Sequence, residues 1–229
     1  MSIFTKLFVK KLLDQKTIGQ EVDRKVQPSK LSNFGSKSVW IAVKSNSTET
    51  VLSNLSLLSL KKTNWLDGMN QVLSFSNSKS VFITEPFNGW VLAIGWGLPI
   101  PQGSRIDDIK SLLNSLSSSF DEAQYFLSYR TTDSTCMIKS KLGKIERAYV
   151  ISDNCSLNTG TPTAIEQKHK FIDLNSPDAN SDQYFDHYTY PTNEEVSKVA
   201  ETWSINPMKI ERYDPAHLGT GYVAILKQN

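Results

Sequence analysis

Stretches in which hydrophobic residues alternate with polar ones predict β-strands at several places in the chain. Two hairpins are indicated, one turning at Asn88-Gly89 and the other at Gly143, because Asn-Gly favours a type I′ turn and glycine accepts positive φ. In the first hairpin we expect Phe87 to pair with Trp90, and Ile83 with Ile94. Further strands are predicted at 38–45, 124–130 and 221–226.

Apolar residues spaced three and four apart predict helices between these strands. The clearest helix covers 104–120, where Ser104 and Asp107 have the spacing of a capping box. Another helix is expected to start at Thr192, again with a capping box. Residues 47–75 are interpreted as a broken helix, whose second part buries Trp65, Met69, Val72 and Leu73.

Strands and helices follow one another without a regular β-α-β alternation, which predicts an α+β fold. We expect a central antiparallel or mixed sheet with helices packed on it. Residues 1–37 are expected to form an N-terminal helix and an arm, and 38–229 a single α+β domain. Residues 154–191 lose all periodicity and predict a long irregular loop, and loops of this length are usually functional or flexible.

Composition excludes several classes of function. A net charge of +2 over 229 residues gives no general attraction to nucleic acid or acidic lipid. No segment reaches the roughly 18 apolar residues of a membrane-spanning helix. The basic amphipathic start of the chain is read as a helix docked on the core, the alternative being a helix that lies on a membrane. It lacks the uninterrupted apolar core of a signal peptide, so we expect a cytoplasmic protein. Cys136 and Cys155 are expected to be reduced thiols, although one bridge between them stays open.

Gly95-Trp96-Gly97 lies between a predicted strand and a predicted helix, where a phosphate loop could occur. The third glycine of a dinucleotide fingerprint is missing, and no Gly-Lys-Ser/Thr follows. Asp107 and Asp108 in the first turn of the helix would also repel a phosphate. We therefore expect these glycines to turn the backbone, and we predict no cofactor.

Catalytic and metal-binding residues form no recognisable motif. Asp182, Asp186 and His187 are suitable metal ligands in type, but their spacing matches no known site, so no metal is predicted. An unrecognised enzyme remains an alternative if Glu85, His187 and Cys136 meet in a cleft.

A basic hairpin at Lys139–Arg147 suggests a further alternative, a regulatory module linked to nucleic acid. The acidic residues beside it dilute its charge, so nucleic acid is not the expected partner. Such a hairpin could equally face an acidic protein.

The segment 178–191 combines carboxylates with aromatic rings. Tyrosine and phenylalanine are good interface anchors, and carboxylates around them complement a basic partner. The alternative is that these rings only fix a long loop to the core. The predicted partner contacts are Asp182, Tyr184, Phe185, Asp186, Tyr188 and Tyr190.

Four sequence pieces resemble a family of uncharacterised bacterial proteins. They are W-L-D-G at 65–68, the V-F-I-T-x-P-x-x-G-W-x-L-x-x-G-x-x-L-P run at 81–99, GKIERAYVI at 143–151 and AETWSINP at 200–207. Members of this family are associated with toxin systems, so the resemblance implies an immunity protein. It implies no catalytic residues.

Together, these observations favour a bacterial immunity protein that binds a cognate protein toxin and neutralises it by occlusion, without catalysis. Two observations would distinguish this hypothesis from its alternatives. One is a toxin gene directly upstream of this reading frame, and the other is the identity of the protein that binds this chain.

Overall fold

The computed structural model describes residues 26–73, 79–103, 105–132, 134–153, 155–214, 216 and 218–227. The predicted N-terminal helix and the Ser104 cap therefore lie outside the described residues. The chain forms two compact units. Unit 1 takes in the described parts of 1–32, 45–98 and 211–229, and unit 2 comprises 33–44 and 99–210.

Unit 1 contains a small antiparallel sheet built around its C-terminal strand. β10 pairs with β1, β3 and β4, and β4 pairs with β5. Helix α3 packs on this sheet. The ring of Trp65 meets the rings of Phe82 and Phe87 edge to face, with centroid distances of 5.6 Å and 5.7 Å. The elements are β1 (Ser29–Lys30), α2 (Thr48–Leu52), β3 (Leu57–Asn64), α3 (Trp65–Leu73), β4 (Ser80–Thr84), β5 (Trp90–Ile94) and β10 (Leu218–Leu226).

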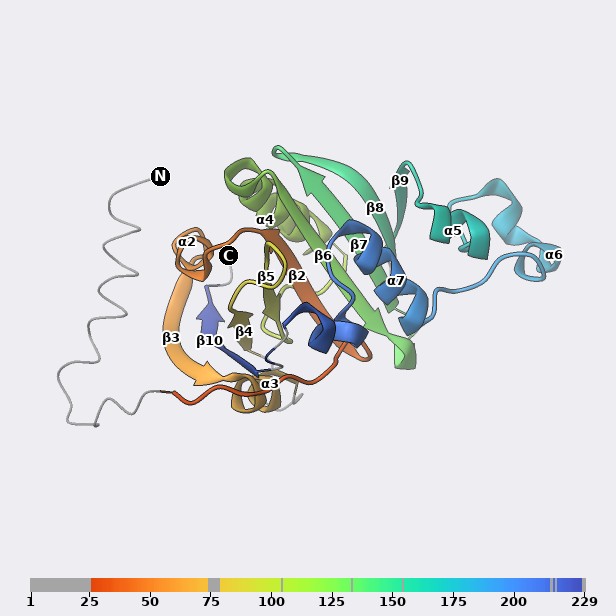
Figure 1. The fold of residues 1–229 in the computed structure, drawn as a ribbon. Coiled ribbons are helices and arrows are strands. Elements are labelled where there is room, and N and C mark those ends of the chain that lie inside the picture. The colour runs from red at the N-terminus through yellow and green to blue at the C-terminus, as the bar shows by residue number, and fades with distance from the viewer. Residues whose placement is uncertain are drawn as a thin grey trace. The chain divides into compact units, whose positions relative to one another are not determined.

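Unit 2 contains five antiparallel strands in the order β2-β6-β7-β8-β9. Helices α4 and α7 cover opposite faces of this sheet (Figure 1). The elements are β2 (Ser38–Lys44), α4 (Arg105–Phe120), β6 (Glu122–Tyr129), η3 (Arg130–Thr132), β7 (Ser134–Lys141), β8 (Lys144–Ser152), β9 (Cys155–Gly160), α5 (Ala164–His169), η4 (Pro177–Asn180), α6 (Asp182–Phe185) and α7 (Asn193–Trp203); η5 (Pro207–Tyr213) crosses the boundary into unit 1.

The predicted α+β fold is confirmed, and every strand pairing described within each unit is antiparallel. Both hairpin turns are also confirmed. Asn88 and Gly89 have φ of 47° and 84°, and Gly143 has φ of 79°. Thr192 caps α7 through the predicted capping box. The strands at 38–44, 122–129 and 218–226 match their patterns to within a few residues.

The prediction of one broken helix at 47–75 is wrong in its middle, because β3 separates α2 from α3. Leu57 and Leu58, which the prediction placed in the helix, belong to β3, and this strand pairs along nearly the whole of β10. Leu73 is 37% exposed rather than buried, whereas Met69 and Val72 are buried as expected.

The segment 154–191 also differs from the irregular loop that was predicted. It begins with β9, which extends the sheet beyond β8, and continues with the short helices α5 and α6. The strand was missed because C-S-L-N-T-G has one strongly apolar residue and takes its stability from pairing with β8.

Candidate functional site

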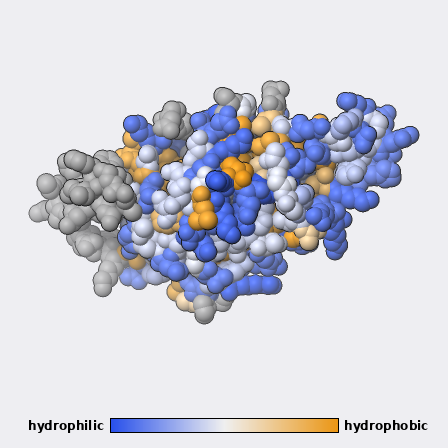
Figure 2. All heavy atoms as spheres, turned by 90° about the horizontal axis from the view of Figure 1, so that it is seen from above, coloured by the Kyte–Doolittle hydropathy of each residue, from blue (hydrophilic) through white to orange (hydrophobic). Residues whose placement is uncertain are grey.

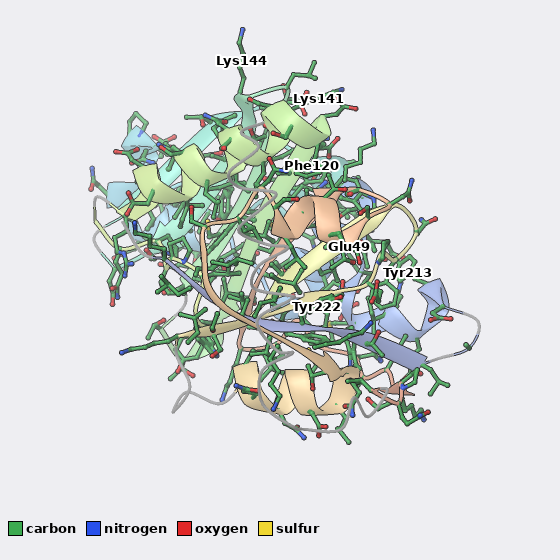
Figure 3. All side chains as sticks on the ribbon, turned by 90° about the vertical axis from the view of Figure 1, so that its left-hand side faces the viewer. Glu49, Phe120, Lys141, Lys144, Tyr213 and Tyr222 are labelled. Atoms are coloured by element: carbon green, nitrogen blue, oxygen red, sulfur yellow. The ribbon has the colours of Figure 1, made fainter. Side chains whose placement is uncertain are left out.

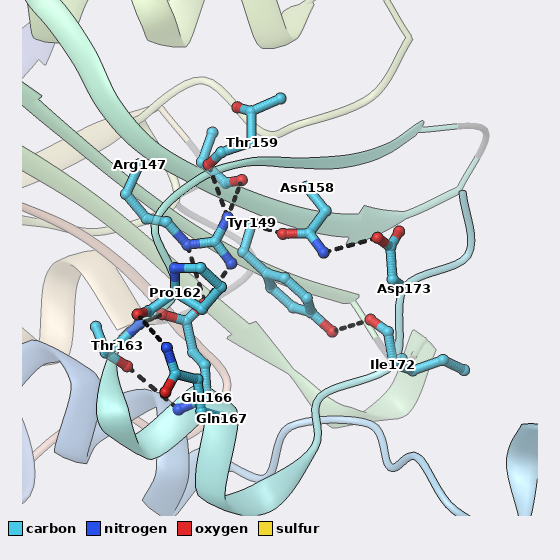
Figure 4. Close-up of polar contacts among 11 residues, drawn as sticks. Arg147, Tyr149, Asn158, Thr159, Pro162, Thr163, Glu166, Gln167, Ile172 and Asp173 are labelled. Carbon is cyan, nitrogen blue, oxygen red and sulfur yellow. Dashed lines mark hydrogen bonds and ion pairs between the residues drawn. The ribbon is translucent and has the colours of Figure 1, made fainter. Parts of the chain in front are cut away.

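A buried polar cluster in unit 2 centres on Arg147 of β8 (Figure 4). Arg147 and Glu166 are each 3% exposed, and both Nε and Nη2 of the arginine donate to the same Glu166 oxygen. Nη1 donates to Oδ1 of Asn158 at 2.8 Å and to the backbone oxygen of Thr159 at 2.7 Å. Such a pair is tolerated inside a protein because its remaining donors are also hydrogen-bonded.

Glu166 joins this cluster to helix α5. Its second carboxylate oxygen accepts from the backbone N–H of Thr163 at 2.6 Å, while its own N–H donates to the Thr163 hydroxyl. These two bonds form the capping box of α5. One side chain therefore both starts the helix and anchors it to the sheet.

The cluster also holds the segment that follows α5. The hydroxyl of Tyr149 donates to the backbone oxygen of Ile172 at 2.8 Å, and the Asn158 amide donates to Asp173 at 2.8 Å. Burial first, and the Glu166 carboxylate next, raise the pKa of Tyr149 well above its ordinary value of 10. Tyr149 therefore stays neutral and remains a donor at physiological pH.

Residues 171–190, which we call the excursion, follow α5 and have neighbouring ends, because Phe171 and Thr189 form an isolated β-bridge. Ile172 N–H donates to Thr189 O at 3.0 Å, and Thr189 N–H donates to Lys170 O at 3.1 Å. In Figure 1 the helix α6 of this segment lies well beyond the edge strand β9. Closed ends and an internal core are typical of compact surface loops that carry function.

Tyr184 is one of the predicted contact residues, and the structure places it inside the excursion. It is only 7% exposed. Its hydroxyl accepts from Asp173 N–H at 2.7 Å and donates to Asp173 O at 3.0 Å. Its ring stacks on Tyr188 at 4.4 Å and meets Phe185 edge to face. Tyr184 therefore positions the two rings beside it and is not itself a free contact.

The other five predicted contact residues are exposed. Phe185, Tyr188 and Tyr190 are 46%, 38% and 42% exposed. Asp182 and Asp186 lie beside them in the same exposed segment, which is mostly hydrophilic when seen from above (Figure 2). We call this set the acidic–aromatic surface: Asp182, Phe185, Asp186, Tyr188 and Tyr190.

This surface belongs to a strongly acidic part of the chain. Between 171 and 197 lie six of the 23 acidic residues and none of the 25 basic ones. The negative charge is therefore local, although the whole chain carries +2. A charge of one sign concentrated on an exposed segment attracts partners of the opposite sign.

The residues considered for catalysis lie in different environments. Cys136 is completely buried in β7, whereas His187 is exposed. Burial, and after it the charge of Cys155, raise the pKa of the Cys136 thiol, which disfavours the reactive thiolate. Glu85 lies in unit 1 and accepts hydrogen bonds from the hydroxyls of Thr48 and Thr220, each at 3.3 Å.

Both cysteines are free thiols. Cys136 lies on β7 and Cys155 on β9, with β8 between them. Two strand spacings are about 9 to 10 Å, whereas a disulfide needs Cα atoms within about 7 Å. The bridge that the sequence left open is therefore incompatible with this sheet.

The basic hairpin is less basic than its sequence suggests. Arg147 is buried against Glu166, and Lys139 lies 3.4 Å from both Glu122 and Glu146. Lys141 and Lys144 remain exposed at the turn, where Figure 3 shows Lys144 pointing away from the ribbon. Two exposed lysines do not make the extended basic face that nucleic acid requires.

Gly95 and Gly97 turn the backbone, as predicted. The N–H of Gly97 donates to Ser80 O, and the N–H of Leu98 donates to Gly95 O, each at 3.1 Å. A Cβ on Gly97 would lie 2.6 Å from Lys79 O. These amides are used inside the protein and are not aimed at an anion.

Sequence reasoning missed the Arg147–Glu166 pair, because hydrophobic alternation says nothing of a partner 19 residues away. One signal was present, since T-A-I-E at 163–166 has the capping-box pattern. It also missed the contact between His169 and Glu195 of α7 at 2.7 Å.

No group of three or more metal-ligating side chains occurs among the described residues. No helix in the described part of the chain is long and apolar enough to cross a membrane. No family model matches the chain, and neither the curated proteins nor the solved structures contain a match.

Proposed function

We propose that this protein is a non-enzymatic binding protein that acts in the bacterial cytoplasm as an immunity protein. It neutralises a cognate protein toxin by covering the surface that the toxin needs. The acidic–aromatic surface carries this proposal. It combines half-exposed rings with carboxylates on a segment without a single lysine or arginine, and it matches a basic partner with apolar pockets.

The internal contacts of the excursion support this proposal. Tyr184 fixes Phe185 and Tyr188, and Asp173 connects Tyr184 to the cluster around Arg147. A surface that is ordered before binding loses less conformational entropy when it binds. Phe185 and Tyr188 can therefore act as anchors at low entropic cost.

The partner can be isolated through the surface itself. A photo-crosslinking amino acid in place of Phe185, in the full chain produced in its host, should capture one predominant protein. The captured protein should arrest bacterial growth when produced alone, and co-production of this chain should relieve the arrest. A captured protein without toxicity contradicts the immunity role.

The contribution of charge can be measured with the purified partner. Reversal of two carboxylates, Asp182→Lys with Asp186→Lys, should weaken binding at least tenfold and reduce its dependence on salt, because steering and close charge pairs are both lost. Calorimetric titration gives the affinity. Asp107→Lys with Asp108→Lys on α4 is a matched control, since it reverses two exposed carboxylates elsewhere in unit 2. Equal affinity of both double variants would remove the acidic–aromatic surface from the interface.

A further inference from the structure

A small hollow lies in unit 2 beside the start of helix α7, with a volume of about 210 Å3. It is formed where β6 ends, β7 begins and the chain enters α7 after the excursion. Its lining is Ser128, Ser134, Thr135, Tyr190, Pro191, Thr192 and Asn193. Each of these residues except Pro191 carries a hydroxyl or an amide.

The floor of the hollow belongs to a row of hydroxyl residues that crosses the sheet. Ser38 of β2 pairs with Ser128 of β6, and Ser128 pairs with Thr135 of β7. Directly paired residues point to the same face of a sheet. Since the Ser128 hydroxyl contacts Asn193 of α7, the three hydroxyls lie on the face that α7 covers.

Part of this row is already engaged in the protein. Ser128 donates to Oδ1 of Asn193, and the Asn193 amide donates to Ser36 at 2.9 Å. The side chain of Asn193 is thereby fixed. Outside the row, Ser134 also lines the hollow, and its hydroxyl contacts that of Thr132 at 2.8 Å.

Two other hydroxyls of the row remain without a partner. Thr135 lines the hollow and is only 4% exposed, yet its hydroxyl makes no side-chain hydrogen bond among the described residues. Ser38 is fully buried, and its hydroxyl likewise finds no partner in the described part of the chain. The Ser38 hydroxyl is fully buried, whereas the Thr135 hydroxyl is not among the fully buried unpartnered atoms. The Thr135 hydroxyl therefore opens on the hollow and is available to a ligand there.

The lining indicates an uncharged ligand. None of the seven lining residues carries a formal charge, and an ion that enters a small hollow without a countercharge loses its hydration uncompensated. The carboxylate of Glu195, in the first turn of α7, is bonded to Thr192 and His169. With Glu194 it makes the first turn of α7 acidic, which disfavours an anion.

We propose that this hollow binds a small neutral polyhydroxy compound of about the size of one sugar ring. The Thr135 hydroxyl bonds its hydroxyl groups, and the half-exposed ring of Tyr190 covers its apolar face. The volume is below the roughly 300 to 1,000 Å3 of pockets that hold drug-sized ligands, which limits the ligand to a single ring. This proposal does not depend on the immunity function.

The test uses the full chain, labelled with 15N and titrated with glucose, galactose and N-acetylglucosamine. At least one of these sugars should shift the amide signals of 134–135 and 190–193 in a saturable way. Thr135→Val, which removes the hydroxyl at constant shape, should weaken that binding about five- to tenfold. Tyr190→Ala, on an exposed side chain, should weaken it as well.

Ser38→Ala is the matched control, because Ser38 belongs to the same row and has no partner but does not line the hollow. Its binding should equal that of the wild type. A sugar concentration of about 50 mM is high enough to detect weak, millimolar binding. The proposal is overturned if none of the three sugars shifts these signals at that concentration. It is equally overturned if Thr135→Val binds like Ser38→Ala, or if sulfate shifts these signals and the sugars do not.

Discussion

The Arg147–Glu166 pair illustrates how much a single residue can decide in this protein. Both side chains are almost completely buried, and Glu166 also caps α5. Removing one partner of a buried ion pair leaves the other charge without compensation, which is strongly destabilising. An exposed pair such as Glu194–Lys198 contributes little, since water screens it.

Glu166→Gln should therefore lower the free energy of unfolding by about 3 kcal/mol, as measured by urea unfolding followed by circular dichroism. The variant Glu194→Gln is the control and should be close to the wild type. A second comparison combines Glu166→Gln with Arg147→Met, and we expect the double variant to lose less than the sum of the single losses. Equal small effects of Glu166→Gln and Glu194→Gln would contradict the importance of the buried pair.

At the scale of elements, the first hairpin shows what sequence patterns can and cannot determine. The turn at Asn88-Gly89 and the pairing of Phe87 with Trp90 are as predicted. Further from the turn the prediction is wrong by one residue, because Ile83 pairs with Ala93 and not with Ile94.

The reason for the shift lies between the turn and the strands. Residues 84–86 of the first strand oppose only residues 91–92 of the second, which is the arrangement of a β-bulge. Pro86 has no N–H, and the N–H of Glu85 donates to Thr220 of β10 instead. The N–H of Leu92 then donates to the hydroxyl of Thr84 at 3.0 Å. A hydroxyl that replaces a backbone acceptor is not visible in a pattern of alternating residues.

The same limit explains the other differences. The capping residue Thr192 acts within one turn, so its short motif was sufficient for prediction. Strand β3 is stabilised by β10, which is far away in the sequence. Strand β9 is stabilised by β8, while its own residues show no apolar alternation. The exposure of the acidic–aromatic surface followed from composition, but the burial of Tyr184 depends on Asp173 and could not be predicted from spacing.

Thr84→Val should lower the free energy of unfolding by about 1 to 3 kcal/mol, because it leaves the buried N–H of Leu92 without an acceptor. Thr84→Ser keeps the hydroxyl and should lose less. Thermal or urea unfolding of both variants provides the comparison. If valine is tolerated as well as serine, the hydroxyl is not a necessary part of the bulge.

At the scale of the whole molecule, the titration of buried tyrosines connects stability to pH. Burial raises the pKa of Tyr125 and of Tyr149 well above the ordinary value of 10. In the unfolded chain both would ionise near pH 10. The unfolded state then binds fewer protons than the folded state, so the free energy of unfolding decreases as pH rises.

The stability contributed by the neutral tyrosines should be fully present below about pH 10 and should be lost progressively above it. Each buried tyrosine contributes a slope of up to about 1.4 kcal/mol per pH unit in that range. Urea unfolding at several pH values between 8 and 11 measures this slope. Tyr149→Phe should have the shallower decline, and an unchanged slope would show that Tyr149 ionises without cost to the fold.

The uneven distribution of charge has a practical consequence for mapping an interface. Trypsin cleaves after lysine and arginine, and between Lys170 and Lys198 the chain has neither. A complete digest therefore releases Phe171 to Lys198 as one peptide, which contains every residue of the acidic–aromatic surface. In a cross-linked complex, a partner fragment that touches this surface stays attached to this one peptide of known sequence. Mass spectrometry can then identify the fragment.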